Sequence, residues 1–434
     1  MKKITIIFVC IPFILIASGQ NALNLKDSAA IYFREVGAAT RKARWLWDKD
    51  LYGPILLVDP ITRKVYANYP DLAGLLKHNG EIYEGILPSN TGIANASVNW
   101  KGRDWAMIAF VSPLFVDDQD IYSLFGHELF HRAQPSLRFP RSNEPDNNHL
   151  DRKDGRIYLR LELGALIKAM HSQSPKEMKT HLTNAFTFRK YRYMLYPGAD
   201  SLENALELNE GMAEYTGYVI SGRNKSEAIL HFERQIDKFI QNPTYVRTFA
   251  YNTLPIYGFL LRLTNKYWNK EINAKTNLAD YFIKKFKIYL PTDISKTALD
   301  IAEKYNAQLI FREELAREEN TKKLIHEYKK KFIEQPHFEI SFKKKNVSFD
   351  PRTLIPIEDK GTVYPVMQAI DVWGILTVKN GALMSPDPDR KVTITAPLKI
   401  EGREVSGDGW ILKLNDGFTV TKDENTGNYK LIKE

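Results

Sequence analysis

Cysteine is almost absent from this sequence. The chain of 434 residues contains a single cysteine, Cys10, which lies in an apolar run close to the amino terminus. One thiol cannot form a disulfide within the chain, and it cannot build a zinc site that uses several thiolates. The fold must therefore depend on hydrophobic cores, and a metal site must use histidine and carboxylate ligands.

The amino terminus has the features of an export signal. Lys2 and Lys3 precede an apolar run at residues 4–17, and small residues end it at Gly19. The run is shorter than the roughly 20 residues that a membrane-spanning helix needs. We therefore expect residues 1–19 to be a signal peptide cleaved near Gly19, which predicts a bacterial protein that is periplasmic or secreted. The mature chain would then contain neither cysteine nor a transmembrane segment.

Internal repeats, low-complexity tracts and glycine-rich phosphate-binding loops are also missing. The formal net charge is +9, but the lysines and arginines are spread along the chain. Nucleic-acid-binding proteins instead gather basic residues beside aromatic or fold-specific motifs. The sequence therefore predicts no nucleic-acid partner. Apolar residues make up 44% of the chain, which is enough for the two or more cores that this length predicts.

Histidine is scarce, with nine residues, but two of them belong to a motif with a chemical meaning. The stretch His127-Glu128-Leu129-Phe130-His131 reads His-Glu-x-x-His. On a helix, residues four apart lie on one face, so both imidazoles can bind one zinc ion while Glu128 acts as a general base. The motif predicts a zinc hydrolase, and it requires a third ligand elsewhere in the chain.

The best source of a third ligand is a predicted helix at residues 201–220. Each residue of an α-helix turns by roughly 100°, so steps of four, three and four residues keep side chains on one face. Four carboxylates have this spacing, namely Glu203, Glu207, Glu210 and Glu214. No lysine or arginine occurs at residues 201–222 to offset their repulsion. The face is either an ordinary solvent-exposed acidic surface or one side of a metal site.

A family resemblance favours the metal site. The segment Asn209-Glu210-Gly211-Met212-Ala213-Glu214-Tyr215 resembles the Asn-Glu-Gly segment of gluzincins, the zinc peptidases that include thermolysin-like enzymes and aminopeptidases. The resemblance implies that Glu210 is the third zinc ligand beside His127 and His131, and that Glu214 orients a ligating histidine. The expected cofactor is thus one zinc ion per chain.

The chain departs from the gluzincin pattern in two ways. His131 and Glu210 are 79 residues apart (210 − 131), which is more than the relatives place between these ligands. At least two further helices must be inserted there, and they are candidates for a lid or a specificity wall. The Gly-Ala-Met-Glu-Asn segment that binds a free amino terminus in the aminopeptidases is missing. A metzincin is excluded, because Gln134 and Leu137 replace the glycine and histidine that it requires.

The resemblance also implies a catalytic mechanism. Glu128 takes a proton from a zinc-bound water, which attacks the carbonyl of a peptide bond. Tyr251 and Tyr257 follow the predicted ligands along the chain, and they are the candidates for a hydrogen-bond donor to the oxyanion. Glu214 and Glu207 are the carboxylates that we expect to support the histidine ligands.

Hydrophobic periodicity predicts an α+β chain. We expect a zincin-like catalytic domain at residues 20–336, in which strands precede the zinc helix and helices dominate after it. The strands are predicted to form two hairpins, one from residues 55–58 and 64–67 and one from residues 96–100 and 105–111. The principal later helices are predicted at residues 156–170, 175–193, 201–220, 225–240 and 247–266.

The composition changes after residue 336. Apolar residues alternate in short runs that are separated by turn signals such as Asn380-Gly381 and Asp416-Gly417. This pattern predicts an all-β accessory domain at residues 337–434, with a sandwich or barrel form. The sequence leaves its role open between contact with glycan or the cell surface, docking of a partner, and bracing of the catalytic domain.

Three functions are compatible with these features. The first is an exported zinc metallopeptidase that acts on a peptide or protein substrate. The second is a zinc hydrolase of a non-peptide amide or ester in glycoconjugates. The third is an inactive binding protein on a zincin frame, although the intact Glu128 beside both histidines argues against it.

Overall fold

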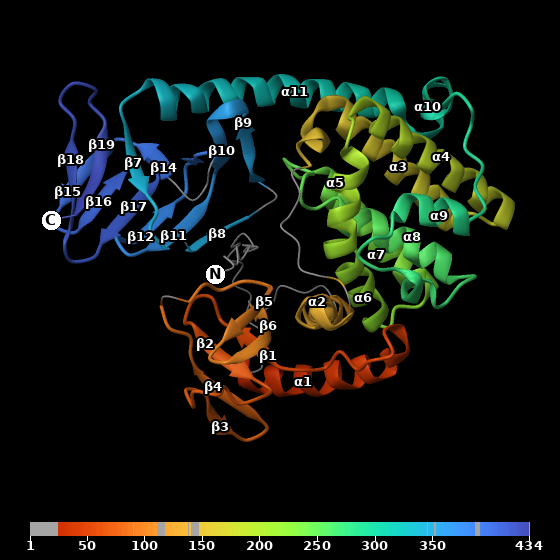
Figure 1. Ribbon diagram of the computed structural model, residues 1–434, viewed down its shortest axis with the longest axis horizontal. Coiled ribbons are helices and arrows are strands. Elements are labelled where there is room, and N and C mark those ends of the chain that lie inside the picture. Colours follow the sequence, from red (N-terminus) through yellow and green to blue (C-terminus); the bar gives the residue numbers. More distant parts are fainter. Residues whose placement is uncertain are drawn as a thin grey trace, which may run out of the picture. The chain divides into compact units, whose positions relative to one another are not determined.

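The computed structural model describes residues 25–89, 91–110, 118–137, 139, 147–344, 346–350, 353–386 and 391–433. The predicted signal peptide and its cleavage near Gly19 lie outside these residues. The chain is α+β, as expected, and its contacts divide it into two compact units (Figure 1). Among the described residues, the first unit contains 25–88 and 95–315, and the second contains those of 89–94 and 316–433. The main division therefore falls within a long helix and precedes the expected boundary at 336.

The first unit opens with a six-stranded mixed sheet. Its strands have the order β3-β4-β2-β1-β6-β5, and both predicted hairpins are confirmed because β1 pairs with β2 and β5 pairs with β6, antiparallel in each case. Strand β1 also pairs with β6 in parallel, and all four of its side chains are buried. The strands are β1 (Ile55–Val58), β2 (Lys64–Ala67), β3 (Lys77–Asn79), β4 (Ile82–Ile86), β5 (Ala96–Trp100) and β6 (Arg103–Ala109).

Helices form the rest of the first unit. Their ends follow local signals: Ser174 caps α4 with Pro175 in its first turn, and Asn224 and Glu227 form a capping box at α7. The helices are α1 (Leu25–Lys42), α2 (Asp118–Ala133), α3 (Lys153–His171), α4 (Pro175–Leu195), α5 (Ala199–Leu206), α6 (Met212–Ile220), α7 (Lys225–Ile240), α8 (Ala250–Arg262), α9 (Leu278–Lys285) and α10 (Ile294–Ala302). Short 3-10 helices are η1 (Arg44–Leu46), η2 (Gln134–Leu137), η3 (Asn148–Asp151), η5 (Trp268–Glu271) and η6 (Glu303–Tyr305).

The predicted continuous α-helix at residues 201–220 is wrong in one respect. Helices α5 and α6 are joined by a π-helical turn, η4 (Glu207–Gly211), which holds one residue more than an α-helical turn. One inserted residue rotates everything that follows by roughly 100°. Carboxylates before and after this turn therefore point in different directions.

Helix α2 lies between the sheet and α6, and it packs against β5, β6 and α6. The crossing with α6 is close because Gly126 and Gly217 meet there without side chains. A Cβ atom on Gly217 would lie 2.3 Å from the backbone oxygen of Ser123, which is far inside van der Waals contact. The two glycines thus allow α2 and α6 to approach each other directly beside the histidine motif.

The second unit contains the carboxyl-terminal part of α11 (Ala307–Lys329), a π-helical turn η7 (Lys330–Glu334) and an all-β region. Two sheets, with orders β18-β19-β7-β14-β13-β10-β9 and β15-β16-β17-β12-β11-β8, share one core around Phe338, Trp373 and Trp410. The elements are β7 (His337–Ser341), β8 (Asn346–Phe349), β9 (Ile355–Ile357), η9 (Glu358–Lys360), β10 (Gly361–Tyr364), β11 (Met367–Asp371), β12 (Gly374–Val378), β13 (Ala382–Met384), β14 (Lys391–Thr395), β15 (Pro397–Glu401), β16 (Glu404–Gly407), β17 (Trp410–Leu414), β18 (Phe418–Lys422) and β19 (Tyr429–Lys433).

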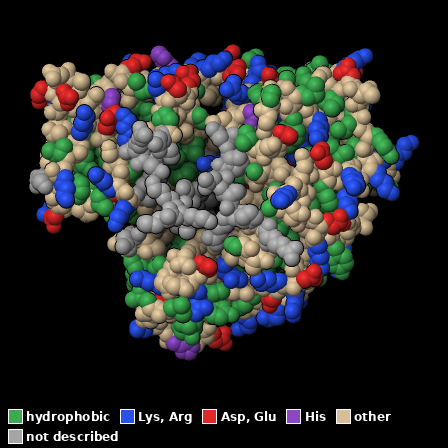
Figure 2. Space-filling model, viewed as in Figure 1, with side chains coloured by type: hydrophobic (Ala, Val, Ile, Leu, Met, Phe, Trp, Pro, Cys, Tyr) green, Lys and Arg blue, Asp and Glu red, His purple; other side chains and the backbone are tan. Residues whose placement is uncertain are grey.

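The described residues contain no helix that is both long and apolar enough to cross a membrane. On the face shown in Figure 2, lysine and arginine side chains are scattered among acidic and apolar ones in both units. This scatter agrees with the sequence, in which basic residues do not cluster.

The glycine contact between α2 and α6 leads to a stability prediction. Gly217→Ala should lower the free energy of unfolding by about 1–3 kcal/mol, because overpacking forces the backbone apart. Gly164→Ala in α3 is the matched control, since its Cβ would meet Tyr305 at an ordinary 3.6 Å and alanine favours a helix. Urea unfolding followed by circular dichroism measures both. Equal stability of the two variants would contradict the proposed close contact.

Candidate metal centre

Both histidines of the motif lie on one face of α2 and are largely buried. His127 and His131 have their Nε2 atoms 3.1 Å apart, with their rings at a centroid distance of 4.7 Å. The helix ends soon after His131, where η2 begins at Gln134 with Pro135 next in the chain. The sheet on one side and α6 on the other fix the direction of this face.

Glu210 approaches the same point from the π turn. Its Oε2 atom lies 3.4 Å from Nε2 of His127 and 3.3 Å from Nε2 of His131. One ligand atom from each of these three residues lies within 4.8 Å of the others, so the group can hold a metal ion. The structure thus brings together the three ligands that the sequence predicts.

The hydrogen bonds of Nδ1 in His127 and His131 show that Nε2 of each ring faces the centre. His127 Nδ1 lies 2.9 Å from Glu214 Oε2, and His131 Nδ1 lies 3.0 Å from Gln134 Oε1. Both partners are acceptors, so each Nδ1 donates a proton, and in the neutral ring the lone pair is on Nε2. Two imidazole lone pairs and a carboxylate oxygen therefore converge on one point, an arrangement that is repulsive unless a proton or a cation lies between them.

Tyr251, from α8, is part of this group. Its ring stacks on His127 with a centroid distance of 5.3 Å and an interplanar angle of 12°. Its hydroxyl donates to Glu210 Oε2 at 2.5 Å. Burial, together with the charge of Glu210, raises the pKa of Tyr251 well above its ordinary value, so the hydroxyl remains a donor.

Glu128 is buried beside the ligands, and its Oε2 atom makes no hydrogen bond within the described residues. Burial raises the pKa of this carboxyl, although the neighbouring His127 and His131 act in the opposite direction. An exposed carboxylate has too little proton affinity to act as an efficient base near neutral pH. Its raised pKa brings the proton affinity of Glu128 closer to that of an efficient base.

The pKa values of the ligands reflect their mutual attraction. Burial alone would lower the pKa of His127 and His131, but Glu210 outweighs it in both, aided by Glu214 at His127, and raises both values. Burial alone would raise the pKa of Glu210, yet the two histidines lower it well below the ordinary value. The centre therefore attracts positive charge, either as protons or as a metal cation.

Two predicted site residues lie elsewhere and require correction. Glu207 does not support the histidines, because both of its oxygens accept hydrogen bonds from Arg189 at 2.8 Å. Tyr257 is not near the metal ligands, since its hydroxyl donates to Glu162 at 2.9 Å. The π turn explains the first error, because it turns Glu207 away from the direction of Glu210.

A buried ionic cluster replaces the expected four-carboxylate face. Arg192 binds Glu203 through two hydrogen bonds of 2.7 and 2.6 Å, and both arginines, Arg189 and Arg192, bind Glu162 from α3. Together with Glu207, which Arg189 also binds, these side chains form a cluster of five that are at most 2% exposed. Burial would raise the pKa of Glu203, but the charge of Arg192 outweighs it and lowers the pKa to about 2. The cations that residues 201–222 lack are thus supplied by α4.

Sequence reasoning missed Arg189, Arg192, Gln134 and Asn209. The arginines have a detectable signal, because they are three residues apart in a predicted helix next to Phe186 and Phe188 and therefore lie near an apolar face. Asn209 belongs to the Asn-Glu-Gly segment, but its contact with Gln134 has no signal in the sequence, and neither does Gln134, since single amides occur throughout any chain. Their role becomes visible only through contacts in space.

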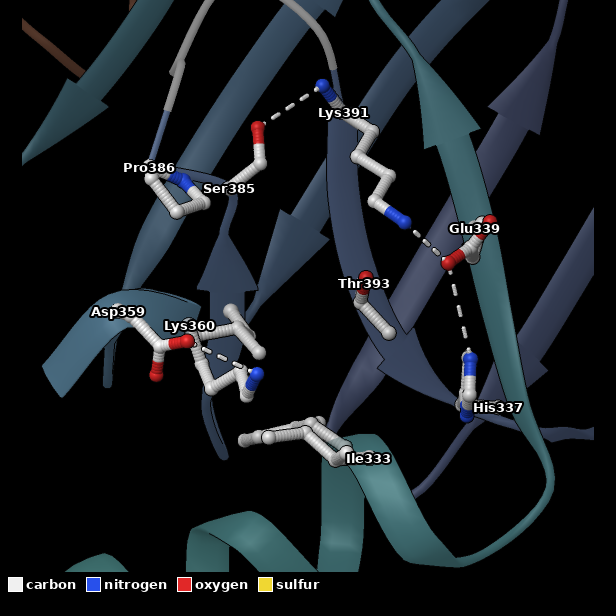
Figure 3. A pocket seen from close by; sticks show the side chains of 11 residues that line it. Ile333, His337, Glu339, Asp359, Lys360, Ser385, Pro386, Lys391 and Thr393 are labelled. Atoms are coloured by element: carbon white, nitrogen blue, oxygen red, sulfur yellow. Dashed lines mark hydrogen bonds and ion pairs between the residues drawn. The ribbon is translucent and has the colours of Figure 1, made fainter. Parts of the chain in front are cut away.

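The all-β region has a separate hollow of about 320 Å³. Figure 3 shows that its charged side chains face one another: Lys391 binds Glu339 at 2.5 Å, and Lys360 binds Asp359 at 3.0 Å. Because these groups are already paired, the hollow does not identify a ligand. Contact of this region with glycan or a cell surface stays a prediction.

Comparison of the chain with protein-family models, with curated proteins and with solved structures finds no match.

Because Glu207 and Glu210 have different partners, replacing the first should affect stability and replacing the second should affect zinc binding. Glu207→Gln should lower the free energy of unfolding by about 3–5 kcal/mol, because it breaks a buried ion pair, and should leave zinc affinity unchanged. Glu210→Gln should abolish tight zinc binding, because it removes a ligand. Urea unfolding of the metal-free protein and competition with a chromogenic chelator measure the two effects. Loss of zinc from a folded Glu207→Gln variant would restore Glu207 to the metal centre.

Proposed function

We propose that this protein is a zinc-dependent hydrolase whose substrates are peptides, with a catalytic centre of the gluzincin type. The observation that carries the proposal is the convergence of His127 Nε2, His131 Nε2 and Glu210 Oε2 beside the buried Glu128. The positions of Glu210 and Glu214 are those that the resemblance to gluzincins implies. Export from a bacterial cell remains part of the proposal through residues 1–19.

The donor set fits zinc. Two imidazole nitrogens and one carboxylate oxygen form the ligand set of many catalytic zinc sites, which keep a further position open. Bound there, zinc would polarise a substrate carbonyl and lower the pKa of a water molecule. Glu214 and Gln134 hold the two rings with their lone pairs directed at the centre.

The protein's own groups then handle the proton. Glu128 has a free carboxylate oxygen and a raised pKa, so it can accept the proton of the attacking water and pass it to the leaving amine. Tyr251 presents a hydroxyl proton at the centre, where it can donate to negative charge that develops on the carbonyl oxygen. Tyr257 has no part in this step.

The resemblance to gluzincins favours a peptide as the substrate, because that family uses two histidines, a glutamate ligand and a general base to cleave peptide bonds. A non-peptide amide or ester of a glycoconjugate is the alternative substrate for the same residues. An inactive binding protein would not need Glu128.

Replacement of the base tests the reaction. Glu128→Gln should reduce hydrolysis by about 10²–10⁴-fold, because the amide cannot accept the proton, while one zinc remains bound per chain. A peptide library digested by zinc-loaded protein provides the assay, with an exposed control, Glu303→Gln, expected to match the wild type. Full activity of the Glu128→Gln variant would rule out the proposed role. Activity on glycoconjugate amides or esters alone would favour the second function.

The two tyrosines provide a further test. Tyr251→Phe should lower kcat by about 10²–10³-fold with little change in KM, because it removes a donor to the oxyanion. Tyr257→Phe is the matched control: it removes a hydrogen bond to the buried Glu162 and should reduce stability without reducing kcat. An unchanged kcat in Tyr251→Phe would limit Tyr251 to its contact with Glu210.

A further inference from the structure

Gln134 lies one turn from the motif, outside every predicted role, and is almost completely buried, with 1% exposure. Its side-chain oxygen lies 3.0 Å from His131 Nδ1 and its amide nitrogen donates to Asn209 Oδ1 at 2.7 Å. The Nδ2 atom of Asn209 in turn donates to Glu210 Oε1 at 2.8 Å. Two neutral amides therefore connect one predicted metal ligand to another.

The carboxylate of Glu210 determines which group is donor and which is acceptor in each of these hydrogen bonds. Glu210 Oε1 belongs to a carboxylate, which only accepts, so Asn209 must present its nitrogen there and its oxygen to Gln134. Gln134 must then donate to that oxygen and present its own oxygen to His131. The ring of His131 consequently carries its proton on Nδ1 and directs the Nε2 lone pair at the centre.

The two histidines are thus held by different means. His127 donates directly to the carboxylate of Glu214, which lies on α6. His131 is held through Gln134 and Asn209, and this connection returns to the other oxygen of a ligand whose Oε2 faces the same centre. Any motion of His131 away from the centre therefore also disturbs Glu210.

We propose that Gln134 is a positioning residue for the metal centre, which acts through Asn209 to fix the tautomer of His131 and the orientation of Glu210 as one unit. The inference rests on the proposed function, because it takes His131 and Glu210 to be zinc ligands. It assigns no chemical step to Gln134. Its effect is on metal affinity, and loss of partners of this kind typically weakens metal binding 10–100-fold.

A double-mutant cycle on zinc affinity tests the proposal. Gln134→Met and Asn209→Leu should each weaken zinc binding by about 10–100-fold. The double variant should bind zinc no more weakly than the single variant with the lower zinc affinity. Gln119→Met is the matched control, because its amide lies at the start of α2, the helix that precedes Gln134, and donates to Glu227 in the exposed capping turn of α7. Chelator competition gives the dissociation constants, and thermal unfolding of each metal-free variant identifies any that fail to fold.

The outcomes separate this proposal from the proposed function. Wild-type zinc affinity in Gln134→Met, or losses in the two single variants that multiply in the double variant, would overturn the positioning unit. Asn209 is only partly buried, so Asn209→Leu keeps the test open if Gln134→Met fails to fold. A wild-type protein that binds zinc but cleaves no substrate would contradict the proposed hydrolase. The zinc affinities of the Gln134 and Asn209 variants would still test the positioning role.

Discussion

The geometry of the candidate metal centre depends on how the carboxylates of α5, η4 and α6 bind two sets of partners. Glu203 and Glu207 are bound by Arg192 and Arg189, whereas Glu210 and Glu214 face the histidines of α2. A regular α-helix would keep all four carboxylates on one side. The π turn at Glu207–Gly211 adds one residue, and this separates the pair of carboxylates that binds arginines from the pair that contacts the histidines. The position of the third ligand therefore follows from an irregularity in the backbone.

The inserted residues between His131 and Glu210 have a function in the fold. The expected extra helices exist as α3 and α4, and they supply Glu162, Arg189 and Arg192 to the buried cluster. The sequence also predicts a lid or a specificity wall for this insertion, and that stays a prediction. Arg189 and Arg192 of α4 bind Glu207 and Glu203, and Glu162 of α3 binds both arginines, so this part of the insertion supports the stretch that leads to Glu210.

Much of the centre was predictable, since the spacing in the histidine motif and the Asn-Glu-Gly segment identified the residues that now lie together. The errors came from two assumptions. A constant helical turn placed Glu207 beside Glu210, although an inserted residue rotates the helix between them. The cations that balance the carboxylates are not their neighbours in the sequence, because Arg189 and Arg192 lie on α4. Short-range patterns predict hairpins and helices well, because they depend on local signals, but they do not report side-chain partners that are distant in sequence.

The buried cluster of Arg189, Arg192, Glu162, Glu203 and Glu207 has a consequence for the environments in which the protein can work. Surface ion pairs weaken as ionic strength rises, because mobile ions screen exposed charges over about 10 Å at 0.1 M salt. These five side chains are at most 2% exposed, so dissolved ions cannot reach them. The support behind the candidate metal centre therefore does not weaken at high ionic strength or strengthen at low ionic strength.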